Sequence, residues 1–297
     1  MKIKSILIVA SIGMMFAACS SEDSTPQNVE KVPIRFTAKI QSLIPSIGTR
    51  VAEGTAGILN NEFPEGAEIT VGFGDGYSSD AVIKNTSGTW SYTTTPLNYP
   101  FNSTTVYALY PKLTSPIANV ARSSYNTPAD QSLIDNYKKA DVLGATADVS
   151  TPSSNPIELS FKHICAKVVV NLSASTTPSD YVIKMKGINL VTMYSGASLM
   201  SSSYGPGEVT LGKYSSAGQT AIIIPQQVAE NTVLFEVSKG ETKYSFTTSS
   251  SITFKAGYKY TFNLTFEDTE ISFGNIIMGA WETDSENSTI GGDLVKN

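Results

Sequence analysis

The sequence predicts an all-β protein made of two β-sandwiches in tandem, and three observations support this prediction. Short segments in which apolar and polar residues alternate follow one another through both halves of the 297-residue chain. Gly, Pro, Asn and Ser bound most of these segments, as they do at turns between strands. Helical periodicity is scarce, and residues 129–139 are the best helical candidate, with one or two turns.

The strand candidates fall into two groups that are separated by a change in composition. The first group is 32–41, 67–73, 80–85, 89–93 and 104–111, and the second is 157–172, 181–191, 207–212, 220–225, 232–238, 242–248, 258–266 and 276–281. Between them, residues 145–156 are rich in Ser, Thr and Pro and show no periodicity, which is typical of a linker. We therefore expect an N-terminal β-sandwich at 32–150 and a C-terminal β-sandwich at 151–297.

The segment 157–172 changes its apolar face at its centre. Odd-numbered residues from Ile157 to Cys165 form one apolar face, and even-numbered residues from Ala166 to Leu172 form the next. A strand with a constant pleat keeps one face throughout. The change predicts a bulge or a corner between two sheets near residues 164–166.

The first eighteen residues have the pattern of a signal peptide. Lys2 and Lys4 precede an apolar run at 6–16, which is too short to span a bilayer as a mature helix. The following "AACSS" resembles the lipobox of bacterial lipoproteins, which implies a lipoprotein signal peptide at 1–18, acylation of Cys19 and a polar tether at 19–31. The alternative is an ordinary secretory peptide cut near Ala18.

The residues after Cys19 indicate where such a lipoprotein would be sorted. Ser20 in place of an aspartate resembles sorting to the outer membrane, and Glu22-Asp23 resembles a short acidic tag for surface export. The formal net charge of −5 and the absence of a basic stripe argue against nucleic acid as a partner. Cys165 is the only other cysteine, so a lipidated Cys19 leaves no intrachain disulfide and the cores must hold the fold.

The chain is poor in residues that carry chemistry, and we expect no catalytic residue, metal or cofactor. The single histidine, His163, lies on an apolar strand face together with Cys165, where a structural role is the expected one. No Cys/His metal spacing or phosphate loop is present, and "GDGYSSD" at 74–80 lacks the ligand set of a calcium loop. Aromatic residues at 90, 92, 99 and 101 could stack on a sugar, although aromatic residues of sandwiches are more often in the core.

The strand at 32–41 and the loop that follows it suggest a different kind of function. Alternation places Val32, Ile34, Phe36, Ala38 and Ile40 on one inward face. The next strand candidate begins at 67, and loops longer than about 12–15 residues are usually functional. Arg50, one of three arginines against eighteen lysines, lies in this loop among Gly, Ser, Thr and Ala, and such loop tips are where proteases cut.

With these features the chain resembles the fimbrillin family, the lipoprotein precursors of protease-assembled (type V) pili. The resemblance rests on the order and spacing of several segments: the lipobox, "IRFTAKI" followed by "TR", "YALYP", "ADVLGA", "LSFKHICAKVVV", "FKAGYKYTFNLT" and the late Trp281. It implies two transthyretin-like β-sandwiches, a surface-exposed location on the outer membrane and later in a pilus, and no enzymatic activity.

The resemblance also implies a mechanism of assembly. An arginine-specific protease would cut after Arg50, which makes Val51 the new N-terminus. Residues 19–50 would then leave with the first strand, and a C-terminal strand of another pilus subunit would take its place by strand exchange. Burial of Val32, Ile34, Phe36 and Ile40 together with Ala38 is worth about 6–13 kcal/mol, as much as the stability of a domain. In the alternative the strand stays in place and the loop is merely variable.

The C-terminal tail departs from the family pattern. Residues 282–297 contain only Ile290, Leu294 and Val295 as apolar residues, and two glycines weaken any strand there. A poor donor strand predicts a tip adhesin or minor subunit that accepts a strand and donates none. The alternative is a monomeric surface lipoprotein that binds a glycan or a host ligand without polymerising.

Overall fold

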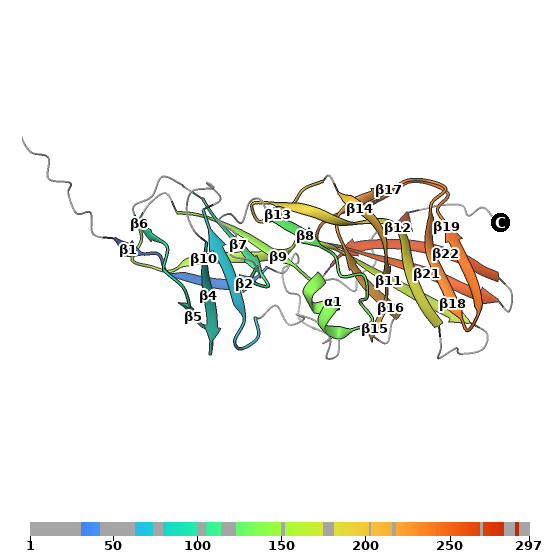
Figure 1. Ribbon diagram of the computed structural model, residues 1–297, viewed down its shortest axis with the longest axis horizontal. Helices are drawn as coiled ribbons and strands as arrows, with labels where there is room; N and C mark the ends of the chain where they lie inside the picture. Colours follow the sequence, from blue (N-terminus) through green and yellow to red (C-terminus); the bar gives the residue numbers. More distant parts are fainter. Residues whose placement is uncertain are drawn as a thin grey trace, which may run out of the picture. The chain divides into compact units, whose positions relative to one another are not determined.

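The computed structural model describes residues 31–41, 63–73, 80–99, 105–113, 123–149, 152–174, 181–201, 203–215, 218–267, 270–281 and 289–290. Every described element lies within one compact unit, Val32–Asn297. The described elements are β-strands and one short helix, α1 (Ile134–Ala140), and the sheets pack as sandwiches (Figure 1). The predicted all-β sandwich fold is confirmed.

The first sandwich is built on a seven-stranded sheet. Its order is β2 (Phe36–Ile40), β10 (Ile157–His163), β9 (Leu143–Asp148), β7 (Thr105–Tyr110), β3 (Glu68–Gly72), β4 (Ala81–Thr86) and β5 (Thr89–Tyr92). A two-stranded sheet of β1 (Val32–Pro33) and β6 (Asn98–Tyr99) accompanies it. Neighbouring strands are antiparallel except β2 and β10, which run parallel. The strand that comes first in the sequence therefore lies at one edge of the sheet.

The second sandwich packs two six-stranded sheets face to face. One has the order β15 (Gly212–Ser215), β16 (Gly218–Ile223), β11 (Ala166–Ala174), β21 (Tyr258–Glu267), β22 (Glu270–Ala280) and β23 (Thr289–Ile290). The other has the order β13 (Ser198–Leu199), β12 (Tyr181–Ser195), β18 (Val233–Lys239) and β19 (Thr242–Thr247), and β14 (Tyr204–Thr210) and β8 (Ser124–Asn126) also pair with β12. A separate hairpin consists of β17 (Gln226–Val228) and β20 (Ile252–Phe254).

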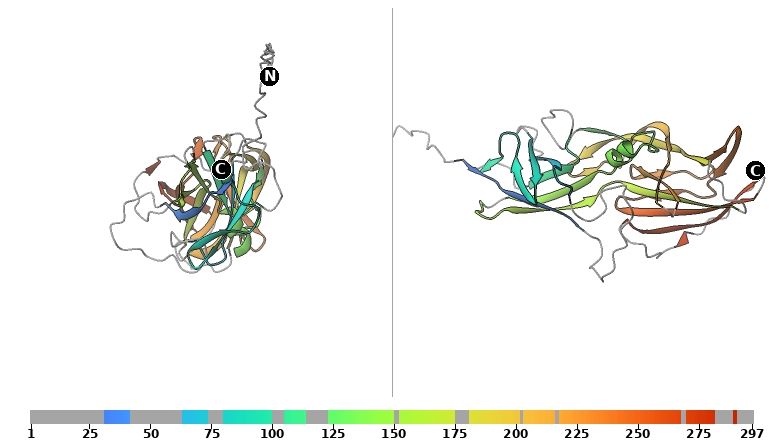
Figure 2. Two further views of the ribbon diagram at one scale, coloured as in Figure 1. Left: turned by 90° about the vertical axis from the view of Figure 1, so that its left-hand side faces the viewer. Right: turned by 90° about the horizontal axis from the view of Figure 1, so that it is seen from below.

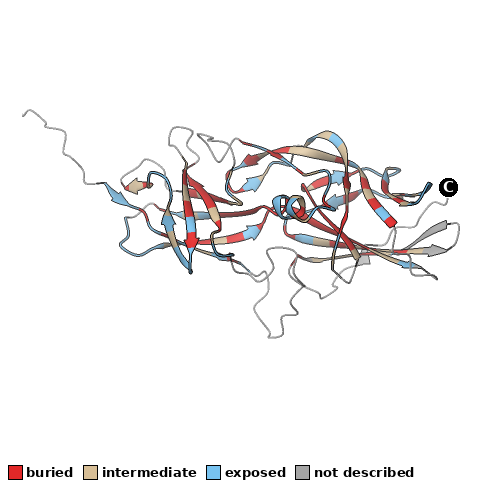
Figure 3. Cartoon of the chain, turned by 60° about the horizontal axis from the view of Figure 1, so that its bottom comes forward, coloured by how far each residue is buried: buried red, intermediate tan, exposed pale blue. Residues whose placement is uncertain are grey.

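Each sandwich has its own apolar core, and buried and exposed residues alternate along the strands that enclose it (Figure 3). The core of the first sandwich includes Ile69, Val106 and Phe161, all fully buried. The core of the second includes Phe235 and Phe262, whose rings meet edge to face at 4.8 Å. Alternation with period two is thus the main determinant of which side chains enter the cores.

The predicted corner near residues 164–166 is confirmed. β10 ends at His163 in the sheet of the first sandwich, and β11 begins at Ala166 in a sheet of the second. Ile164 and Cys165 between them are buried, and the N–H of Ile164 donates to the carbonyl of Val142. The change of apolar face thus marks the place where the chain passes from one core to the other.

The domain boundary expected at residues 150–151 stays a prediction. β10, which follows this boundary, belongs to the seven-stranded sheet of the first sandwich, and β8, which precedes it, pairs with β12 of the second sandwich.

A third apolar cluster lies where the two sandwiches meet. We call it the junction cluster; it contains Leu109, Tyr125, Tyr137, Ala140, Val142, Ile164, Cys165, Tyr194, Ile222, Ile224 and Trp281. Gly144 of β9 comes so close to the turn after β12 that a Cβ there would lie 2.0 Å from the carbonyl oxygen of Ala197. The lack of a side chain at Gly144 therefore permits this contact between the sandwiches.

Three buried glutamines connect strands through their side-chain amides. Gln131 bonds to both the N–H and the carbonyl of Ile222, Gln219 accepts from the N–H of Ile183 and donates to the carbonyl of Tyr181, and Gln226 bonds to both groups of Asn189. A primary amide offers a donor and an acceptor side by side, as a strand backbone does. These side chains therefore continue the backbone hydrogen bonding where the strands themselves do not pair.

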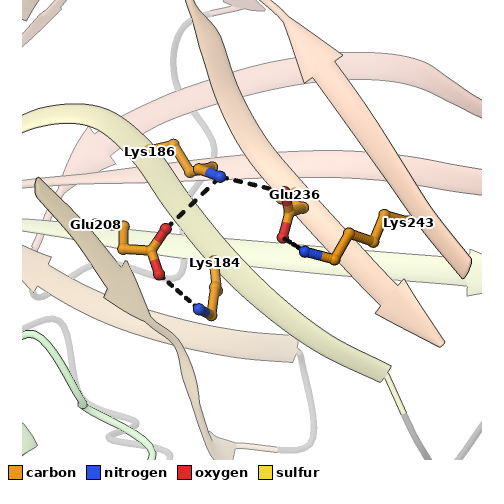
Figure 4. Close-up of polar contacts among 5 residues, drawn as sticks. All are labelled: Lys184, Lys186, Glu208, Glu236 and Lys243. Atoms are coloured by element: carbon orange, nitrogen blue, oxygen red, sulfur yellow. Dashed lines mark hydrogen bonds and ion pairs between the residues drawn. The ribbon is translucent and has the colours of Figure 1, made fainter. Parts of the chain in front are cut away.

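Alternating charges cross the outer face of the second sandwich. Lys184, Glu208, Lys186, Glu236 and Lys243 follow one another across β12, β14, β18 and β19 (Figure 4). The two lysines that flank Glu236 lie 3.1 Å and 3.2 Å from its carboxylate oxygens. Hydrogen bonds from Lys186 and Lys243 hold the pKa of Glu236 below its ordinary value.

Replacing Glu236 by Gln is expected to reduce the acid sensitivity of the fold. Because the pKa of Glu236 is lowered in the folded state, its contribution is present above the unfolded-state pKa and is lost as the pH falls below about 4.5. Glu236→Gln should lower the Tm by about 1–3 °C at pH 7 and less at pH 3.5, since ion pairs whose lysines stay in contact with water are weak. Thermal unfolding at pH 7 and pH 3.5 measures this change in Tm, and the exposed Glu241→Gln is the control. An equal loss of Tm at both pH values would contradict the prediction.

Candidate functional site

The residues that the sequence nominates for processing lie mostly outside the described part of the chain. Cys19, Arg50 and Val51 belong to residues that the structure does not describe. The segment 32–41 is described in full. The candidate site is therefore this segment together with the residues that hold it, which we call the first-strand site.

Residues 32–41 do not form the single strand that the alternation predicts. β1 pairs antiparallel with β6, in the register Val32↔Tyr99 and Pro33↔Asn98. β2 pairs parallel with β10, from Phe36↔Ile157 to Ile40↔Phe161. At Ile34 and Arg35 the segment thus changes its strand partner from β6 to β10. Both parts lie along the margin of the first sandwich, where β2 is the blue strand beside β10 (Figure 2).

Burial along this segment follows the prediction in part. Ile34, Phe36 and Ile40 are buried, and Ala38 is half-buried against the same core. Val32 was expected to face inward, but 48% of its surface is exposed. It belongs to β1, which pairs with β6 and is not part of the seven-stranded sheet that covers the core. Burial of the three large side chains Ile34, Phe36 and Ile40 stabilises the bound strand by about 4.5–9 kcal/mol. This is less than the roughly 6–13 kcal/mol expected if Val32 were buried as well.

On one side, β10 holds the segment through backbone hydrogen bonds. The N–H of Ile157 donates to the carbonyl of Arg35 at 2.8 Å, and the N–H of Gln41 donates to the carbonyl of Phe161 at 2.6 Å. The ion pair between Lys39 and Glu158 at 2.7 Å holds the pKa of Glu158 below its ordinary value. More than half of each of these two side chains is exposed, so the pair adds little to the backbone bonds.

On the opposite side of the segment, Tyr92 at the end of β5 and Leu97 after it form hydrogen bonds to the backbone of one residue, Ile34. The N–H of Ile34 donates to the carbonyl of Leu97 at 2.9 Å, and the hydroxyl of Tyr92 donates to the carbonyl of Ile34 at 2.8 Å. The Tyr92 ring also meets Phe36 edge to face, with centroids 6.4 Å apart. Burial raises the pKa of Tyr92 well above its ordinary value, so the hydroxyl stays a donor at any physiological pH.

Phe63 belongs to the core next to this site, although the sequence predicts a loop between residue 41 and the next strand at 67. Its ring packs edge to face against Trp90 at 5.3 Å and against Tyr110 and Phe161 at 5.1 Å each. The turn after it is closed by the N–H of Ala67, which donates to the carbonyl of Pro64. The aromatic residue before a proline turn is the one signal that could have placed Phe63 in the core.

The described members of the aromatic group at 90–101 do not form a free sugar-stacking surface. Trp90 packs on Phe63, Tyr92 holds Ile34, and Tyr99 is buried in the core of the first sandwich. Phe101 lies outside the described residues. The described rings thus serve the core and the first-strand site.

His163 and Cys165, which were expected to be structural, are buried at the junction of the sandwiches. Nδ1 of His163 lies 2.7 Å from Oδ1 of Asp141, and its ring stacks on Trp281 at 4.1 Å with an interplanar angle of 5°. Only 7% of His163 is exposed, so no substrate reaches this His–Asp pair. Burial raises the pKa of Cys165 to about 12, which keeps the thiol protonated and unreactive.

The described residues contain neither a cluster of metal-binding side chains nor a membrane-spanning helix. Among them, no group of three or more His, Cys, Asp or Glu side chains could hold a metal ion. Within the same ranges, no helix is long and apolar enough to cross a membrane.

The C-terminal strand β23 pairs with β22 of the same chain, in the register Ile290↔Ile276 and Thr289↔Ile277.

Comparisons with known proteins agree with this architecture. A family model described as fimbrillin-like matches residues 49–281, which is more than half of the chain. The crystal structure of a candidate cell adhesion protein from Bacteroides ovatus superimposes with a TM-score of 0.64 at 17% identity, and the match covers 86% of this chain and 100% of that one. A second candidate cell adhesion protein, from Bacteroides uniformis, gives a TM-score of 0.58 at 14% identity and covers 84% and 98%. These identities show a shared fold alone, and no curated protein matches the sequence.

Replacing His163 by Gln is expected to destabilise the junction of the sandwiches. The change removes the stacking on Trp281 and weakens the buried contact with Asp141, which together are worth about 2–3 kcal/mol. Urea unfolding measures the loss, and adhesion of cells that display the variant should be unchanged. Lys162→Gln, on the exposed face of the same strand, is the control. Loss of adhesion in a variant of undiminished stability would indicate a binding site instead.

Proposed function

Because the chain belongs to the fimbrillin-like family, we propose that it is a structural and adhesive subunit of a cell-surface pilus that assembles by strand exchange. Membership of this family points to a structural, non-enzymatic protein. The partners are other pilus subunits, an arginine-specific protease that prepares the chain, and the outer membrane before processing.

The edge position of β2 is the observation that carries this proposal. Among the described strands, β2 pairs with β10 alone, and β1, which precedes Ile34, pairs with β6. Removal of residues 32–41 would leave an unpaired edge on β10 and an apolar groove where Ile34, Phe36 and Ile40 had been. A strand from another subunit restores both the hydrogen bonds and the burial, which is the principle of donor-strand complementation.

Processing after Arg50 would prepare the chain for this exchange. The cut releases residues 19–50, including the first strand, and makes Val51 the N-terminus. The family match begins at residue 49, which leaves nearly all of the released segment outside it. Arg35 would escape cutting because its carbonyl is bonded to Ile157 within the sheet, and proteases need an extended, free backbone.

The anchor before processing would be a lipid on Cys19. The lipobox-like "AACSS" supports acylation at this residue, and Ser20 supports sorting to the outer membrane. Several acyl chains hold a protein on a membrane without a spanning helix. The precursor is then a surface lipoprotein, and cutting after Arg50 frees it from the membrane for assembly.

Within the pilus, a tip or minor position is the role that the C-terminal tail supports. The tail has few apolar residues, and Thr289 and Ile290 pair with β22 of the same chain. A subunit with such a tail accepts a strand and donates none. The alternative is a monomeric lipoprotein that captures a glycan or a host ligand, and it gains no support from Tyr99, which is buried, or from Tyr92, which is half-buried and bonded to Ile34.

Replacing Arg50 by Ala is expected to stop assembly without affecting folding. The variant should unfold at the wild-type temperature, because residue 50 lies outside the buried first strand, yet remain an intact lipid-anchored monomer. Mass spectrometry of surface-extracted protein measures the outcome: the wild type should begin at Val51. Arg122→Ala is the matched control and should be processed normally. A wild-type chain that still begins at Cys19 in cells with an active arginine-specific protease and assembled pili would refute the processing step.

Replacing Cys19 by Ala is expected to release the precursor from the membrane. In the proposed precursor, the acyl chains on Cys19 are the anchor, so their removal takes away the contact with the bilayer. Fractionation of cells should move the variant from the membrane fraction to the soluble one, and labelling with a fatty-acid analogue should disappear. Membrane retention of Cys19→Ala at the wild-type level would exclude this anchor.

A further inference from the structure

The two sides of the first-strand site recognise the strand in different ways. On the β10 side, the backbone bonds run through Arg35 and Gln41, both odd-numbered residues. In a parallel pair, both polar groups of alternate residues point to the same neighbour. The even-numbered residues therefore direct their backbone groups to the opposite side, where Tyr92 and Leu97 lie.

Ile34 is bonded on that opposite side by both of its backbone groups. The Leu97 carbonyl accepts from its N–H at 2.9 Å, and the Tyr92 hydroxyl donates to its carbonyl at 2.8 Å. We call these two groups the backbone clamp. They bracket one residue whose side chain is fully buried, so the clamp and the core act on the same position.

We propose that the backbone clamp of Tyr92 and Leu97 selects the incoming strand, by requiring an apolar residue with a free N–H at the position of Ile34. This inference rests on the proposed strand exchange and names what the site accepts. Proline at that position has no N–H for Leu97, and a polar side chain there would be buried without a partner. The Tyr92 hydroxyl recognises a backbone carbonyl, so its contribution is independent of the donor's other side chains.

The remaining positions complete the description of the partner. The donor is an extended segment of another kind of subunit, with a bulky apolar residue at the Phe36 position against Tyr92, a small one at Ala38 and an apolar one at Ile40. The chain's own tail fits poorly: the register that places Ile290 at the Phe36 position and Leu294 at the Ile40 position puts Ser288 into the buried Ile34 position. A second copy of this chain is therefore not the donor.

The test measures strand replacement in the full-length protein after it has been cut at Arg50 in vitro. Peptides that copy residues 32–41 are labelled, and their incorporation is followed by native mass spectrometry. N-methylation at Ile34, which removes the N–H that Leu97 accepts, should lower incorporation about three- to tenfold. N-methylation at Ala38 is the matched control, and a smaller loss is expected there. A peptide of residues 286–297 should not be incorporated.

Substitution of the clamp tests it from the protein's side. Tyr92→Phe keeps the ring against Phe36 and removes only the hydroxyl, so incorporation of the unmodified peptide should fall about three- to tenfold. Tyr125→Phe removes a comparable hydroxyl that donates to the carbonyl of Ala140 in the junction cluster, and it should leave incorporation unchanged. Equal losses for both N-methylated peptides, or wild-type incorporation by Tyr92→Phe, would overturn the clamp; incorporation of the tail peptide at the level of the 32–41 peptide would overturn the choice of donor.

The uncut chain separates this inference from the proposed function. If no peptide replaces the resident strand after cutting, strand exchange fails as the function. Amide hydrogen exchange at Ile34 in the uncut protein still tests the clamp, because the hydroxyl of Tyr92 holds that residue in place. Tyr92→Phe should speed exchange at Ile34 about three- to tenfold while Tyr125→Phe leaves it unchanged, and equal rates in all three proteins would overturn the clamp.

Discussion

The parallel pairing of β2 with β10 is the contact on which the first sandwich depends. β2 comes first among the strands of its sheet, and its partner is the last of them in the sequence. Without β2, β10 becomes an unpaired edge and the core loses Phe36 and Ile40. The first sandwich is therefore a structure whose closing strand can be supplied by this chain or, in principle, by another one.

β10, the strand against which β2 lies, is itself connected to the second sandwich. β10 continues through the corner at Ile164 and Cys165 into β11, and His163 at its end stacks on Trp281. The junction cluster thus fixes the strand with which β2 pairs, and with which an incoming segment would pair in the proposed exchange. A groove that is already in its binding conformation loses less conformational entropy when it is filled, which favours replacement of one strand by another over collapse of the empty site.

Periodicity predicted much of this fold, and its failures have physical reasons. The change of apolar face within 157–172 located the corner between the sandwiches, because a side chain's face is set by the pleat alone. β9 was missed because "LGATAD" carries small residues with little contrast between its faces. The change of partner at Ile34 and the clamp of Tyr92 were also missed, since they depend on hydrogen bonds from residues about sixty positions away, which no local pattern records. Cys19 and Arg50 remain sequence predictions, because the described residues do not include them.

In the proposed assembly, the covalent link between the first strand and the rest of the chain is the reason that cutting would have to precede exchange. Burial of Ile34, Phe36 and Ile40, at about 4.5–9 kcal/mol, holds the strand equally well before and after the cut. What the cut removes is the effective concentration of a tethered strand, which is on the order of millimolar for a connected segment. After such a cut, a strand that leaves would be diluted into the surroundings, and a donor on another subunit would compete with it on equal terms. Under this proposal, the same contacts that close the precursor would bind the next subunit, and a single proteolytic event would determine which strand they hold.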